Sequence, residues 1–182
     1  FGFNTKPLKV SDKFVNLLID SEINPDSWIS LSIDSGSNEI FNKVHGMNTK
    51  APLYDNVLKN VNRIKVANSK FRKFDISAAY LLNKYNSSKE EISKFISDFK
   101  NAGCNLLRFS FAQPPRGLVD KGKIDTVPLK DEKNTIMKNV KDFIESHDED
   151  NCRVIVTDPD TEKNIFYKDR TLPCVARFIY PT

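Results

Sequence analysis

Apolar and polar side chains alternate along residues 28–34. Successive side chains of an extended chain point to opposite faces, so this alternation predicts a strand with one apolar and one polar face. The apolar face carries Ile29, Leu31 and Ile33, and the polar face carries Ser30, Ser32 and Asp34. The apolar face needs a helix against it. The polar face either meets water or lines an enclosed site, where its groups need partners.

Two later segments repeat this alternation, at about Phe74 to Leu82 and at Asn105 to Phe111. In each segment polar residues share one face, namely Asp75 with Ser77 and Arg108 with Ser110. A solvated sheet face would explain one such strand. Three consecutive strands with aligned polar faces favour an enclosed site over open water.

Segments with apolar residues at helical spacing separate these strands. They cover about residues 11–21, 39–44, 52–67 and 87–103. A capping box of Ser87 and Glu90 opens the last helix, and Gly103 ends it. Strands joined by helical crossovers form a parallel sheet. The predicted fold class is therefore α/β, a partial (β/α) barrel of the TIM type with outer helices and polar strand faces inside.

The predicted barrel covers residues 1–116, and a small C-terminal α+β extension covers residues 117–182. The extension is expected to hold a helix over 131–146, a strand over 152–157 and a hairpin strand at 165–167. Ligands of such barrels bind near the carboxyl ends of the strands. We expect Asp34, Ser77 and Arg108 to lie there.

Composition narrows the class of protein. The chain has 182 residues, 39% of them hydrophobic, and a net charge of +4. Its basic residues are scattered over polar helix faces, which argues against a nucleic-acid surface. No apolar run is long enough to span a membrane, and no leader is recognised, so we expect a cytoplasmic protein. The three cysteines, at 104, 152 and 174, are too few and too far apart for a disulfide framework.

Three stretches together resemble the second half of the barrel of radical S-adenosylmethionine (SAM) enzymes. They are ISLSIDSGSNEIFNKVHG (29–46), SAAYLLNKYNSSKEEI (77–92) and GCNLLRFSF (103–111). The last segment, LPCVARFIYPT (172–182), resembles the start of a cysteine-containing extension that follows the barrel in some members.

The resemblance implies an enzyme in which three thiolates hold a [4Fe-4S] cluster and the free iron binds the amine and carboxylate of SAM. An electron from a donor such as flavodoxin or ferredoxin then cleaves SAM, and the resulting radical removes a hydrogen atom from an unknown substrate. By the resemblance, the SAM-binding candidates are Ser32, Asp34, Ser77 and Arg108. Cys174 is a candidate ligand of an auxiliary cluster, and no catalytic residue is assigned.

The chain departs from this family in one respect. The family's three-cysteine cluster motif, C-x3-C-x2-C, is absent from these 182 residues. We expect the motif upstream of Phe1, which would make this chain a fragment that is inactive alone. A relative that has lost the chemistry is the alternative.

Other interpretations stay open at this stage. Asp34 can serve as a loop-closing carboxylate, and Arg108 can pair with Asp75 on the adjacent strand. His45 fits a helix C-terminus, and the two cysteines at 104 and 152 fit a core. The alternative functions are a barrel aldolase or isomerase using Asp34 and Arg108, and a binding module without catalysis.

Overall fold

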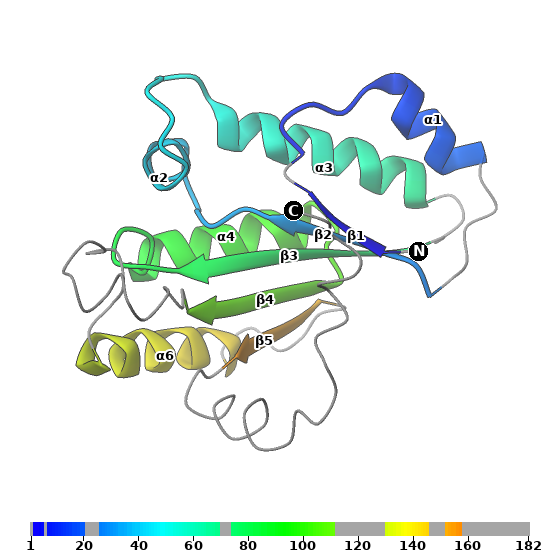
Figure 1. Ribbon diagram of the computed structural model, residues 1–182. Coiled ribbons are helices and arrows are strands. Elements are labelled where there is room, and N and C mark those ends of the chain that lie inside the picture. The colour runs from blue at the N-terminus through cyan, green and yellow to red at the C-terminus, as the bar shows by residue number, and fades with distance from the viewer. Residues whose placement is uncertain are drawn as a thin grey trace, which may run out of the picture.

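A computed structural model describes residues 2–5, 7–20, 26–69, 74–111, 130–145 and 152–157. Within them, five strands form one sheet in the order of the sequence, and all neighbouring strands are parallel (Figure 1). The strands are β1 (Gly2–Thr5), β2 (Trp28–Ser32), β3 (Asp75–Leu82), β4 (Leu106–Phe111) and β5 (Arg153–Thr157). This arrangement confirms the predicted α/β class and is consistent with part of a barrel.

Helices precede or follow each strand, as the spacing of apolar residues predicts. They are α1 (Asp12–Asp20), α2 (Asn38–Val44), α3 (Leu53–Ser69), α4 (Lys89–Asn101) and α6 (Lys130–Glu145). None of the described helices has both the length and the apolar character needed to cross a membrane.

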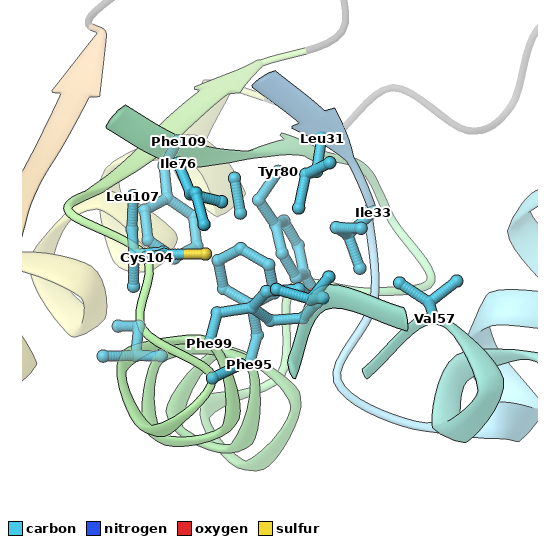
Figure 2. Close-up of a cluster of buried hydrophobic side chains, with 14 of the residues drawn as sticks. Leu31, Ile33, Val57, Ile76, Tyr80, Phe95, Phe99, Cys104, Leu107 and Phe109 are labelled. Carbon is cyan, nitrogen blue, oxygen red and sulfur yellow. The ribbon is translucent and has the colours of Figure 1, made fainter. Parts of the chain in front are cut away.

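The core lies between one face of the sheet and the helices α3, α4 and α6. Its sheet side is made by alternate residues of β2, β3, β4 and β5, as period-two burial requires. Aromatic rings fill its centre: Tyr80 lies 4.7 Å from Phe95 and 5.2 Å from Phe109 between ring centroids. Figure 2 shows Tyr80, Phe95, Phe99 and Phe109 gathered together, with Cys104, just before β4, beside them. The expectation that Cys104 belongs to the core is confirmed, since it is buried.

The opposite face of the sheet carries the polar positions in register. Ser30 pairs with Ser77, and Ser77 with Leu106. One row closer to the carboxyl ends, a second row consists of Ser32, Ala79, Arg108 and Ile155. A third row brings together Leu81, Ser110 and Thr157. The alignment of polar strand faces predicted from the sequence is therefore present.

Helix α4 starts one residue later than the sequence predicts. The N-cap of α4 is Ser88, whose side chain accepts from the backbone N–H of Glu91 at 3.3 Å, and the predicted pair of Ser87 and Glu90 is wrong. The turn at residues 84–86 sets this start one residue later.

The strand expected in the C-terminal extension is β5, which pairs with β4 in the same sheet. Residue 116 and the hairpin strand at 165–167 lie outside the described residues.

Candidate functional site

The polar face of the sheet is open in the described part of the chain. Trp28 and Leu81, which lie on it, are 41% and 42% exposed. The described residues that pack into the core come from the other face. A ligand can therefore reach the polar face without displacing the core.

Asp34 follows β2 directly and closes the loop there. Its backbone has a φ of 60°, a left-handed conformation that aspartate tolerates better than most residues. Its Oδ1 accepts a hydrogen bond from the N–H of Leu81 in β3, at 2.7 Å. The loop-closing interpretation of Asp34 is thus observed. A carboxylate offers about four acceptor positions, so this bond does not by itself exhaust the group.

Asn86 ties the Asp34 loop to the end of β3. This residue is fully buried, and its Nδ2 donates to the carbonyls of Asp34 (2.8 Å) and Leu81 (2.9 Å). Its Oδ1 accepts from the N–H of Asn83 at 2.7 Å. Asn86 was not among the candidate site residues, although it lies within the quoted stretch 77–92. The available signal is an asparagine within a turn, where such side chains bond nearby backbone.

Tyr80 completes this network from the core side. Its hydroxyl donates to the carbonyl of Asn86 at 2.6 Å. Burial raises the pKa of Tyr80 well above its usual range, and the nearby carboxylates of Glu91 and Asp34 raise it further. The hydroxyl therefore keeps its proton and remains a donor at physiological pH.

A second contact anchors the same loop to α4. The N–H of Gly36 donates to Oε2 of Glu91 at 2.7 Å. A Cβ at Gly36 would lie 2.2 Å from the carbonyl oxygen of Glu91, so only glycine fits here. Between these anchors, the hydroxyl of Ser35 is buried without a partner among the described residues. Gly36 and Glu91 both lie in the stretches that carry the family resemblance, but nothing in the sequence indicates that they meet.

The four candidate SAM-binding residues share one face of the sheet but not one depth. Asp34 lies at the carboxyl end of β2, and Ser32 is the last residue of that strand. Ser77 is the third of eight residues in β3, so the expectation that it lies near the carboxyl end is wrong. Arg108 lies in the middle of β4, in the same row as Ser32. Ser77 also donates a long hydrogen bond, 3.4 Å, to the carbonyl of Ile29.

The row of Ser32, Ala79 and Arg108 spans three adjacent strands. Neighbouring strands are about 4.8 Å apart, so the backbones of Ser32 and Arg108 are about 10 Å apart. Ala79 between them leaves the middle of the row free of bulk. A ligand of small-molecule size that contacts both residues would lie across β3.

Several single-residue interpretations are settled by the contacts. Arg108 and Asp75 are four residues apart in register, and the described ion pairs, Arg63 with Asp12 and Lys94 with Asp98, do not include them. The pairing of Arg108 with Asp75 is therefore wrong.

His45 caps the C-terminus of α2 and its Nε2 donates to the carbonyl of Ile33 at 3.1 Å, which confirms its structural role.

Metal ligands are not assembled in the described residues. No group of three or more His, Cys, Asp or Glu side chains there could hold a metal ion. Cys104 is buried, its pKa is raised by desolvation, and Cys152 packs against the core. Cys174 lies outside the described residues. The described part of the chain therefore does not by itself supply the ligands of an iron–sulfur cluster.

The fold has counterparts among solved structures. It is similar to a crystal structure of Streptococcus suis SuiB, with a TM-score of 0.61 and 13% sequence identity. A structure of SuiB bound to S-adenosylmethionine matches with a TM-score of 0.58 and 14% identity. Each match covers 86% of this chain and 32% of the SuiB chain. This chain thus spans about a third of the length of SuiB.

No protein-family model matches the sequence, and no curated protein matches it either. At these identities the likeness to SuiB shows the fold.

Proposed function

We propose that this chain forms the second half of the barrel of a radical SAM enzyme and that the carboxyl end of β2 binds SAM. The observation that carries the proposal is the position of Ser32 and Asp34 at the open carboxyl end of a parallel strand. The similarity of the fold to a structure that holds SAM supports it. When bound at a reduced cluster, SAM supplies the radical that starts the reaction.

The protein's part is to bind and orient. The hydroxyl of Ser32 and the carboxylate of Asp34 can accept hydrogen bonds from the ribose diol or the ammonium of SAM. Asp34 is held in place from three sides: Leu81 donates to its carboxylate, Asn86 donates to its carbonyl, and Glu91 accepts from Gly36 two residues on. A group fixed in this way loses little freedom on binding, which favours affinity.

The proposal places the three cluster cysteines and any auxiliary cluster outside the described residues, with Cys174 as one candidate ligand. An electron donor of the flavodoxin or ferredoxin type would reduce the cluster. These elements rest on the sequence resemblance.

The test uses the full-length protein that carries this chain, reconstituted anaerobically with iron and sulfide. With a strong reductant it should cleave SAM to 5′-deoxyadenosine, and equilibrium dialysis should show SAM binding. Asp34→Asn keeps an oxygen for the N–H of Leu81 and a residue that tolerates positive φ, so the fold should survive. Losing the charge should weaken SAM binding about tenfold, as expected for a hydrogen bond to a charged group.

Asp75→Asn is the matched control, because Asp75 lies on the same face at the amino end of β3. Its SAM affinity should equal that of the unaltered protein. SAM binding without cleavage would favour a binding module. Absence of both binding and cleavage refutes the proposal.

A further inference from the structure

Among the described residues, Arg108 is a cation on the open face of the sheet that has no carboxylate partner. It lies in the middle of β4 and is exposed. In the described part of the chain it forms no hydrogen bond and no ion pair. Two carboxylates share its face, and neither is close: Asp75 is four residues away in register, about 13 Å along the strand. Asp34 follows β2, two strands away, and bonds Leu81.

The neighbours of Arg108 are small, hydroxylated or apolar. Ala79 and Ile155 flank it in its own row. In the row toward the carboxyl ends, Ser110 and Thr157 stand side by side, and both are half-buried. This gives one guanidinium and two hydroxyls that can donate, while the carboxylate of Asp34, beside the same row, accepts from the N–H of Leu81.

Such a set of groups fits an oxyanion. A guanidinium stays charged at any physiological pH and presents a planar fork that matches carboxylate or phosphate oxygens with two parallel bonds. In the complete barrel of the proposed enzyme this face is enclosed, and a charge there is costly unless it is paired. An oxyanion at Arg108 supplies that pairing.

We infer that Arg108, with Ser110 and Thr157 beside it, binds an anionic group, carboxylate or phosphate, of the enzyme's substrate. This inference rests on the proposed function. SAM carries a single carboxylate, which the resemblance assigns to the cluster iron. The anion at Arg108 is therefore the substrate's, and it lies about 10 Å across the sheet from Ser32.

The probes are inorganic phosphate and acetate, added to protein labelled with 15N-arginine. The Nε–H resonance of Arg108 is assigned from its loss in Arg108→Lys. It should shift saturably with phosphate, acetate or both, which tells the two kinds of oxyanion apart, and sodium chloride of equal ionic strength should not reproduce the shift. Arg108→Gln should weaken the stronger probe about tenfold or more, by fluorescence or calorimetry.

Arg153→Lys is the matched control, because Arg153 lies on the same face at the start of β5 and is also exposed. It should keep the probe's affinity. An equal shift at Arg153, or a shift that chloride reproduces, means general screening and overturns the inference. Circular dichroism and a thermal melt establish that each variant is folded.

A titration with SAM separates this inference from the proposed function. SAM should bind together with the probe and leave the probe's affinity within about twofold. If SAM displaces the probe, Arg108 is a cofactor residue and the inference is wrong, while the proposed function stands. If the protein binds the probe but neither binds nor cleaves SAM, the proposed function fails, and with it the assignment of the anion to a substrate.

Discussion

The two faces of the sheet do different work. One face presents large apolar side chains to α3, α4 and α6 and has almost no exposed surface. The other presents serines, an alanine and an arginine, with Trp28 and Leu81 both more than a third exposed. A single alternating pattern produces both. The difference teaches that the apolar face determines stability, whereas the polar face is free to be selected for binding.

The largest effect is expected on the apolar face. Phe109→Ala removes a ring that is fully buried and in contact with Tyr80 and Phe95. It should lower the free energy of unfolding by about 3–5 kcal/mol. Arg108→Ala, at the preceding residue on the open face, should change it by less than about 0.5 kcal/mol. Urea unfolding of both variants tests the contrast, and similar losses would abolish it.

The next effect is expected where the two faces meet, at the loop after β2. Gly36→Ala would drive a Cβ into the backbone oxygen of Glu91, so the loop or α4 has to move. We expect a loss of about 3 kcal/mol, at the upper end for overpacking. Gly46→Ala is the control, because its Cβ would meet nothing within 4 Å and only its φ of 63° opposes the change. It should cost about 1 kcal/mol. Equal losses would show that the contact with Glu91 yields at little cost.

Asn86→Ala should have a smaller effect than Gly36→Ala on the same loop. It leaves the carbonyl of Asp34 and the N–H of Asn83 without their partner, and buried unpaired groups cost about 1–3 kcal/mol. Exchange of the Leu81 amide hydrogen should speed up, because that N–H bonds the Asp34 carboxylate. Asn38→Ala, which removes an exposed bond to Asp55, should leave Leu81 protected. Unchanged protection in Asn86→Ala would contradict the bracing role.

The smallest effect is a dependence of stability on alkaline pH. Burial raises the pKa of Tyr80 and of Tyr54 in the folded state, while the unfolded chain ionises near the usual value of about 10. The folded state therefore holds its protons where the unfolded state loses them. Stability is fully present below pH of about 10 and falls as the pH rises above it.

Urea midpoints between pH 8 and 11 test this prediction. Tyr80→Phe should flatten the decline, and the double variant with Tyr54→Phe should flatten it further. A decline of unchanged steepness would show that these hydroxyls do not carry the effect.

The sequence predicts the strands, the helices and the shared polar face, because alternation and helical spacing are local properties. The depth of each polar residue depends on strand register and on where a strand starts. For that reason Asp34 lies at the carboxyl end of β2 as expected, whereas Ser77 lies near the amino end of β3 and Arg108 lies in the middle of β4. The starting residue of α4 depends on the turn before it, which shifted the cap from Ser87 to Ser88.

The contacts that hold the Asp34 loop in place could not be predicted from the sequence. Glu91 and Gly36 are far apart in sequence and meet only when α4 packs beside β2. Asn86 is an ordinary turn residue until its side chain reaches two neighbouring strands. Contacts of this kind follow from the packed fold, and a single sequence carries no signal for them.

The side chain at position 79 limits the size of a ligand that can lie across β3. Its single methyl group separates Ser32 from Arg108 on the open face. A longer side chain at this position would act as a steric filter, rejecting bulky molecules while the helices beneath stayed as they are. A single substitution at this position would then change which ligands a related barrel accepts, without any cost to the stability of the fold.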